Sequence, residues 1–245
     1  MRTLFLLVLP FLGAACAGAP APTAPPPMHT ATQPAPRDAR WQDTAAAIVA
    51  KAREGGHRLL FLGDSITEGW RGAGKDAWRD FWEPRHALNA GIGGDRTQHV
   101  LWRLDRGLLA ALAAPNNDVR ACVVMIGTNN SNGTDHDATQ IADGIVAVVQ
   151  RLRTGLPNAK VLLLAVFPRG EQPNAQREKN AAASRLAFAA FVHDDHVLCR
   201  DIGARFLATD GAISKDVMSD FLHLSAAAYR TWAEAIVADV DSMRQ

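Results

Sequence analysis

Short apolar runs alternate with longer amphipathic segments from about residue 44 to the end of the chain. The longer runs are apolar at consecutive positions rather than at alternating ones. This pattern is typical of strands covered on both faces, as in a parallel sheet. We therefore predict five strands, at residues 58–62, 86–89, 119–126, 160–167 and 196–202.

The segments between these runs have the spacing of helices. Apolar residues recur on one face between residues 137 and 153, where Asp137 and Gln140 form a plausible capping box. Ser225 is a natural N-cap for the last helix. Strands that alternate with helices predict a doubly wound α/β domain. The other helices are expected at residues 44–53, 174–192 and 225–243.

Polar stretches follow three of the predicted strands, and a fourth precedes the last helix. They read GDS at 63–65, GIGGD at 91–95, GTNN at 127–130 and DFLH at 220–223. In open α/β sheets, ligands bind beyond the carboxyl ends of the strands. The four stretches therefore predict one site at that edge of the sheet.

The residue types in these stretches suit acyl transfer. A serine hydroxyl becomes a nucleophile when a neighbouring base accepts its proton. His223 can supply that base for Ser65, and Asp220 can hold the imidazole in the required tautomer. The N–H groups of Ser65 and Gly94 and the side-chain amide of Asn129 can form an oxyanion hole.

Each stretch taken alone has a simpler interpretation. Ser65 would be a helix N-cap, residues 91–94 a turn and residues 129–130 a loop. Asp220 and His223 would be ordinary surface residues. The occurrence of all four stretches at one sheet edge favours a catalytic site over these interpretations.

The motifs resemble those of the SGNH, or GDSL-type, hydrolases. Longer stretches are similar to the catalytic subunits of type Ib platelet-activating-factor acetylhydrolase and their bacterial relatives. The resemblance covers roughly residues 40–240, and Ile66 stands where the family name has leucine. The similar stretches are LNAGIGGDRTQHVLWRL at 88–104, MIGTNNSN at 125–132, PRGEQPNAQREKN at 168–180 and DFLHLS at 220–225.

This resemblance implies a three-layer, flavodoxin-like fold with a sheet of five parallel strands. It also implies serine esterase activity that needs neither a metal nor another cofactor, carried by Ser65, His223 and Asp220. Short acyl groups, above all acetyl, are the expected leaving acids. The animal subunits pair, which suggests a homodimer.

The N-terminus predicts export. Residues 1–17 have the layout of a secretory signal peptide, with one arginine, an apolar run and small residues. Ordinary cleavage fits, and so does a lipoprotein box ending at Cys16, so we expect a periplasmic, secreted or lipid-anchored protein. Residues 18–37, rich in Pro, Ala and Thr, predict a tether. Residues 38–245 then form one hydrolase domain.

The net charge bears on the partners of the protein, and the cysteines bear on its redox state. The net charge of the 245-residue chain is +1, which gives no sign of a nucleic-acid partner. Cys122 and Cys199 each lie in an apolar run, so either two buried thiols or a disulfide fits the sequence.

The substrate is the least constrained feature. Export favours an acetylated carbohydrate over a platelet-activating-factor-type phospholipid. Trp70 and Arg96 are candidate substrate contacts, although a core position for Trp70 and a structural ion pair for Arg96 also fit. A non-catalytic carbohydrate- or partner-binding module on the same fold is the competing class. Acyl transfer to a second sugar would use the same residues as hydrolysis.

Overall fold

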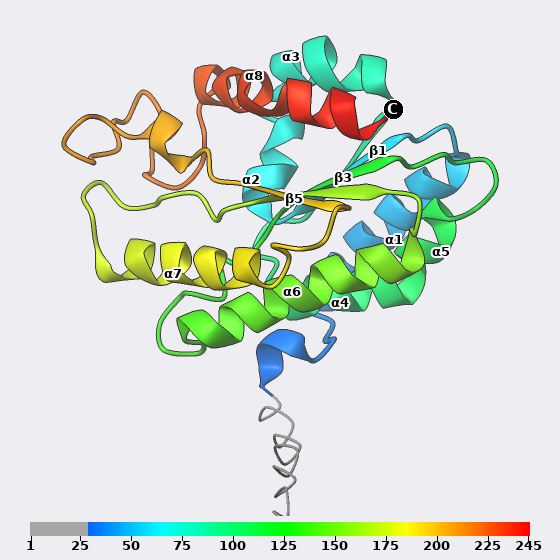
Figure 1. Cartoon of the computed structure of the whole chain (residues 1–245), viewed down its shortest axis with the longest axis horizontal. Coiled ribbons are helices and arrows are strands. Elements are labelled where there is room, and N and C mark those ends of the chain that lie inside the picture. The colour runs from blue at the N-terminus through cyan, green and yellow to red at the C-terminus, as the bar shows by residue number, and fades with distance from the viewer. Residues whose placement is uncertain (1–28) are drawn as a thin grey trace, which may run out of the picture.

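The computed structural model describes residues 29–245, so the predicted signal peptide, Cys16 and the first part of the tether lie outside the described residues. Five parallel strands form a sheet in the order β2-β1-β3-β4-β5 (Figure 1). This order is that of flavodoxin-like folds, so the predicted fold class is confirmed. The strands are β1 (Leu59–Gly63), β2 (Ala87–Gly91), β3 (Ala121–Met125), β4 (Lys160–Leu164) and β5 (Val197–Arg200).

Helices cover both faces of this sheet (Figure 1). One layer contains α1, α4, α5, α6 and α7, and the other contains α3 and α8. The bounds are α1 (Ala39–Glu54), α2 (Ser65–Glu68), α3 (Lys75–Ala77), α4 (Thr97–Arg103), α5 (Leu109–Leu112), α6 (Ala138–Gly155), α7 (Ala175–Ala189) and α8 (Ala226–Met243).

Two predicted helix caps are confirmed. The carboxylate of Asp137 accepts the Gln140 N–H at 2.9 Å, and the Gln140 side chain accepts the Asp137 N–H at 3.1 Å. Ser225 Oγ accepts the N–H of Ala228 at 3.3 Å. Each cap satisfies a backbone donor that the first turn of a helix leaves unpaired.

The core has two halves, one on each face of the sheet. Leu60 and Leu62 of β1 pack with α1, α4 and α6, while Leu59 and Phe61 pack on the opposite side with aromatic residues beneath α8. All four side chains are fully buried. Burial on both faces explains why the strand is apolar at consecutive positions.

The sequence pattern did not predict the helices between residues 97 and 112. Here α4 runs into a distorted turn, η5 (Leu104–Leu108), and then into α5. Arg103 interrupts the apolar pattern although its side chain is buried, and Gly107, with φ of 110°, breaks the helix. A buried ion and a kink both weaken the helical periodicity on which the prediction depended.

The domain begins before the boundary predicted at residue 38. Residues 30–32 form the 3₁₀ turn η1 (Thr30–Thr32), in which Ala31 is fully buried. Thr97 Oγ1 donates to the Ala31 carbonyl at 2.7 Å, and the Ala35 N–H donates to the Gln98 carbonyl at 3.2 Å. The Pro, Ala and Thr composition suggested a tether, but small residues also pack closely against a surface.

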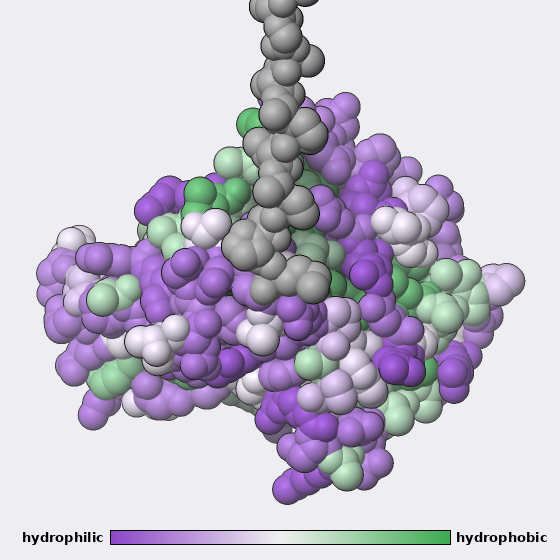
Figure 2. Space-filling model, turned by 90° about the horizontal axis from the view of Figure 1, so that it is seen from below, coloured by the Kyte–Doolittle hydropathy of each residue, from purple (hydrophilic) through white to green (hydrophobic). Residues whose placement is uncertain are grey.

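Figure 2, which shows the molecule from below, displays mostly hydrophilic residues with hydrophobic ones in separate small areas. No helix within residues 29–245 is long and apolar enough to cross a bilayer. Cys122 and Cys199 are free thiols on β3 and β5, with β4 lying between them.

Candidate active site

The four polar stretches meet beyond the carboxyl ends of the strands. Ser65 begins α2 directly after β1, and the N-cap of that helix is Asp64. Asp64 Oδ1 accepts the Ile66 N–H at 3.0 Å. The cap position is therefore filled by the neighbouring residue, and the Ser65 hydroxyl has no capping role.

Ser65, His223 and Asp220 form a continuous chain of polar contacts. Ser65 Oγ lies 2.9 Å from Nε2 of His223, and Nδ1 of the same ring lies 2.6 Å from Asp220 Oδ2. The imidazole thus has a carboxylate on one nitrogen and a hydroxyl on the other. This arrangement suits an imidazole that accepts the serine proton.

Asp220 is held by more than the imidazole. Its second oxygen accepts the N–H groups of Leu222 at 3.1 Å and His223 at 2.8 Å. Burial acts to raise the pKa of Asp220, but these backbone donors and the His223 ring outweigh it, and the pKa is lowered. The carboxylate is therefore charged at neutral pH and can stabilise an imidazolium.

Phe221, between the acid and the base, has an unusual backbone. Its φ is 59°, in the left-handed region that bulky residues avoid. The Gly170 N–H donates to the Phe221 carbonyl at 2.8 Å, which ties this loop to the segment after β4. Backbone strain of this kind concentrates at functional sites, where the surrounding structure imposes it.

The glycine-rich stretch after β2 lies against Ser65. A Cβ added to Gly93 would lie 3.8 Å from Ser65 Cβ, and Gly94 has φ of 77°. Asn129 Nδ2 donates to the Asp95 carbonyl at 2.9 Å, which joins the third stretch to the second. Within residues 29–245 no acceptor pairs with the N–H of Ser65 or Gly94.

Asp95 and Arg103 hold the glycine-rich stretch after β2 in place through buried contacts. Asp95 is fully buried, accepts Trp41 Nε1–H at 2.7 Å and lies 2.8 Å from Arg103 Nη2. The same guanidinium donates to the carbonyls of Ala90 at 2.7 Å and Gly63 at 3.3 Å. One buried cation therefore fixes the ends of β1 and β2 together with the loop that follows β2.

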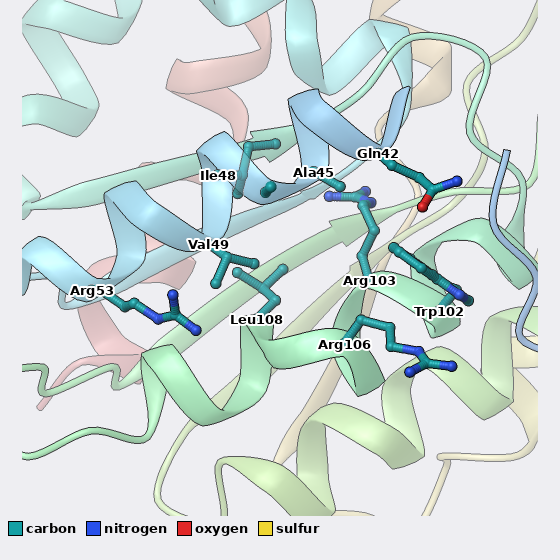
Figure 3. Close-up of a pocket in the computed structure, with 10 residues that line it drawn as sticks. Gln42, Ala45, Ile48, Val49, Arg53, Trp102, Arg103, Arg106 and Leu108 are labelled. Carbon is teal, nitrogen blue, oxygen red and sulfur yellow. The ribbon is translucent and has the colours of Figure 1, made fainter. Parts of the chain in front are cut away.

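A cavity of about 200 Å³ lies between α1 and the α4–η5 segment (Figure 3). Ile48, Val49, Trp102 and Leu108 supply much of its lining, and Arg103 extends along it. Neither Ser65 nor a residue of the 220–223 stretch lines it. We therefore do not assign this cavity to the substrate of the serine.

Comparison with known proteins agrees with this geometry. The model of the GDSL-like Lipase/Acylhydrolase family matches residues 61–231, from β1 into α8. The chain belongs to this family. It is also 40% identical over 192 residues to the platelet-activating factor acetylhydrolase IB subunit alpha2 of Rattus norvegicus, covering 78% of this chain and 80% of the relative.

Solved structures of this hydrolase fold are similar at lower identity. An acetyl xylan esterase, AlAXEase, superposes with a TM-score of 0.61 at 23% identity, over 75% of this chain and 99% of the other. A GDSL-like lipase from Bacteroides thetaiotaomicron superposes with a TM-score of 0.59 at 19% identity, over 83% and 96%. Family and relatives together make this protein a carboxylic ester hydrolase.

The two candidate substrate contacts of the hydrolase, Trp70 and Arg96, make contacts within the protein instead. Trp70 is fully buried and packs against Trp232 and Tyr229, with ring centroids 4.8 and 4.7 Å away, so the expected contact at Trp70 is wrong. Its apolar ring contributes to the core beneath α8 instead. Arg96 Nη1 lies 2.8 Å from Asp135 Oδ2, which is the structural ion pair considered as its alternative.

Two polar residues of the site were missed by the sequence analysis. Asp64 is fully buried with Oδ2 unpaired among the described residues, and burial raises its pKa to about 7. Arg169 follows β4 and is half-buried, with Nη1 donating to the Thr128 carbonyl at 3.3 Å and to Asn132 Oδ1 at 3.1 Å. Its position after a strand, in the stretch PRGEQPN, was the signal that could have revealed it.

No group of three His, Cys, Asp or Glu side chains among residues 29–245 is arranged to hold a metal ion. The groups beside Ser65 are the imidazole of His223, with its carboxylate partner Asp220, and the glycine-rich stretch after β2. Such a set suits nucleophilic attack on a carbonyl carbon and stabilisation of the oxyanion that forms.

Proposed function

We propose that this hydrolase is a serine esterase that removes acetyl groups through an acyl-enzyme. The contact chain from Ser65 Oγ to His223 Nε2, at 2.9 Å, and from Nδ1 to Asp220, at 2.6 Å, carries the proposal. A serine hydroxyl with this support differs from an ordinary surface serine because a base lies within reach of its proton.

The first half-reaction forms the acyl-enzyme. His223 Nε2 takes the proton from Ser65 as Oγ attacks the ester carbonyl carbon, and Asp220 stabilises the imidazolium. The electron pair of the carbonyl π bond moves to the oxygen, and we expect the N–H groups of Ser65 and Gly94 and the Asn129 amide to stabilise the resulting oxyanion. The C–O bond to the alcohol then breaks, and the alcohol leaves with the proton from Nε2.

The second half-reaction releases the acid. Water attacks the acyl-serine carbonyl while His223 Nε2 accepts a water proton. Collapse of the second tetrahedral intermediate breaks the bond to Ser65 Oγ, which recovers the proton from the imidazolium. The products are the free alcohol and the carboxylic acid, and no other reactant is consumed.

Acetyl is the acyl group that the comparisons support best. The 40% identical relative is named an acetylhydrolase, and a solved structure with this fold is an acetyl xylan esterase. We favour an acetylated carbohydrate as the substrate, since the N-terminal pattern predicts export to a compartment where such polymers are met. A platelet-activating-factor-type phospholipid is the second candidate, and the identity to that acetylhydrolase favours it.

Hydrolysis of p-nitrophenyl acetate, butyrate and octanoate tests the activity and the acyl length. We expect turnover to be fastest with acetate and to fall with chain length. Ser65→Ala should remove turnover, whereas Ser242→Ala, an exposed serine in α8, should not. Equal, slow background in the protein and in Ser65→Ala would support a binding module without catalysis instead.

Two further substrates separate the candidates. An acetylated oligosaccharide should be deacetylated with a higher kcat/KM than an ether phospholipid that carries a 2-acetyl group. The reverse order would favour the phospholipid. Added acceptor sugar should not receive the acetyl group, and formation of a new acetyl ester on the acceptor would indicate acyl transfer.

We also propose that the protein is exported, as the layout of residues 1–17 indicates. Cell fractionation should find it outside the cytoplasm. Comparison with Cys16→Ser then distinguishes the two forms, because only a lipid-anchored protein moves from the membrane fraction to the soluble fraction in this variant. A cytoplasmic location would contradict export.

A further inference from the structure

Arg169 is a cation without a carboxylate partner beside the candidate active site. Its Nη1 donates to the carbonyl of Thr128 at 3.3 Å, to Thr128 Oγ1 at 3.2 Å and to Asn132 Oδ1 at 3.1 Å. All three acceptors are neutral. Within residues 29–245 Arg169 forms no ion pair, although it is half-buried.

Two acids influence the charge of Arg169, but neither forms an ion pair with it among residues 29–245. Asp64 and Asp220 both act on its guanidinium electrostatically. Asp220 is committed to His223 and to two backbone N–H groups. Asp64 is fully buried, and its Oδ1 caps α2. Neither carboxylate therefore neutralises Arg169 by direct contact.

The loop that carries Arg169 is fixed in place. Arg177 Nε and Asn174 Nδ2 both donate to the Arg169 carbonyl at 3.1 Å. The next residue, Gly170, donates its N–H to the carbonyl of Phe221, in the loop that holds Asp220 and His223. Thr128, the partner of the guanidinium, directly precedes Asn129. Arg169 is thus linked through Gly170 to the loop of the base and through Thr128 to the segment of Asn129.

The unused edge of the guanidinium has the geometry of an oxyanion receptor. Nη1 makes all the hydrogen bonds of Arg169, and Nε and Nη2 donate to no acceptor in the described part of the chain. Neither Nε nor Nη2 is among the fully buried, unpaired polar atoms of residues 29–245, so each keeps some contact with solvent. Nε–H and one Nη2–H point the same way and can bind two oxygens of a carboxylate or phosphate together.

We propose that Arg169 is a specificity-determining residue that binds an oxyanion on the substrate, close to the acetylated hydroxyl. The substrate class is therefore an acetate ester that carries a carboxylate or a phosphate, such as an O-acetylated uronic acid or an acetylated glycerol phosphate. This inference rests on the proposed esterase activity and narrows its substrate.

Matched ester pairs test the inference. Hydrolysis of a methyl O-acetylglucuronoside is compared with that of the corresponding neutral methyl O-acetylglucoside, and acetylglycerol phosphate is compared with monoacetylglycerol. The protein should prefer the anionic member of at least one pair in kcat/KM. The preferred pair identifies the carboxylate or the phosphate as the oxyanion.

The variants separate binding of the substrate from support of the loop. In Arg169→Gln the ratio of anionic to neutral kcat/KM should fall by about tenfold or more, mostly through KM, because one charge-assisted fork is lost. Arg169→Lys should keep an intermediate ratio, since it retains charge without the fork. Arg205→Gln, an exposed arginine in η6 (Gly203–Phe206), should keep the full ratio.

A purely structural Arg169 would give a different result. Its loss would lower hydrolysis of both members of a pair equally and leave the ratio unchanged, which would overturn the proposal. No anionic preference in the unaltered protein would overturn it as well. In either case Ser65-dependent cleavage of the neutral esters would leave the proposed esterase activity standing, whereas its absence would refute that activity itself.

Discussion

At the scale of single residues, two neighbours have separate roles: Asp64 caps α2, and Ser65 contacts the candidate base. Asp64 Oδ1 caps α2, so Ser65 Oγ is free to contact His223. The cost falls on Asp64, whose Oδ2 is buried without a partner among residues 29–245. Burial disfavours the charged carboxylate and raises its pKa to about 7.

This shift predicts how stability depends on pH. In the unfolded chain the carboxyl loses its proton near pH ~3.9, so between about pH 4 and 7 the folded state holds one proton more than the unfolded state. Asp64 therefore favours folding below that range, and this contribution is lost as the pH rises to 7. Asp64→Asn keeps the cap but removes the titration.

We expect the free energy of unfolding of the protein, relative to Asp64→Asn, to fall by roughly 2–4 kcal/mol from pH 4.5 to pH 8. Urea unfolding at both pH values measures this difference. Asp137→Asn is the matched control, because Asp137 is an exposed helix cap. A difference between the protein and Asp64→Asn that does not change with pH would contradict the raised pKa.

Asp220 is expected to act on catalysis rather than on stability. Asp220→Asn removes the charge that faces Nδ1 of His223 and lets the ring adopt the wrong tautomer. We predict that kcat for p-nitrophenyl acetate falls by about 10³–10⁴-fold with little change in KM. Asp216→Asn, an exposed acid in the same loop region, should change kcat less than about twofold. Equal effects of the two changes would remove Asp220 from the proposed mechanism.

At the scale of elements, the strands were predictable and several helices were not. The central strands β1, β3 and β4 are apolar on both faces, which leaves a strong signal in the sequence, whereas the edge strands β2 and β5 leave a weaker one. The segment from α4 to α5 leaves a weak one, because Arg103 is polar yet buried and Gly107 interrupts the helix. The position of Ser65 followed from the end of a strand and that of His223 from the start of the last helix, whereas the surroundings of Trp70 depended on its packing against α8.

The loop between Asp220 and His223 stores strain at Phe221. A side chain with φ of 59° costs about 1–2 kcal/mol relative to glycine. Phe221→Gly and Phe221→Ala both remove the ring, but only glycine accepts this backbone freely. We therefore predict that the Gly variant is more stable than the Ala variant by about 1 kcal/mol in urea unfolding.

The same comparison at an ordinary backbone position provides the control. At Phe188, inside α7, alanine should be the more stable replacement, because glycine is disfavoured in a helix. An Ala variant at Phe221 that equals or exceeds the Gly variant would show that the left-handed conformation is not imposed on this loop.

At the scale of the whole molecule, residues 29–37 pack against the domain next to the candidate active site. Arg37 Nη1 donates to the Gly93 carbonyl at 2.6 Å and lies 3.6 Å from Asp95 Oδ1. The buried Ala31 fixes the start of the same segment against α4 and α6. The sequence could not reveal these contacts, because the segment's composition is also that of a tether.

This packing predicts different outcomes for two truncations. A chain that begins at residue 38 loses Ala31 and Arg37, whereas a chain that begins at residue 29 keeps both. We expect the shorter chain to be less stable by about 2–4 kcal/mol and to have a lower kcat, since Gly93 loses a support next to Ser65. Chemical unfolding and ester hydrolysis measure both effects. Equal stability and equal kcat of the two chains would show that the domain begins at residue 38, as the sequence predicts.

The most direct test of the central claim is covalent labelling of Ser65 by a fluorophosphonate, measured by intact mass and peptide mapping. The account predicts one adduct per chain, located on Ser65, with labelling strongly slowed in His223→Gln and unchanged in His193→Gln, a histidine of an exposed turn. An unlabelled protein, or an adduct on another residue, would contradict the assignment of Ser65 as a nucleophile activated by His223.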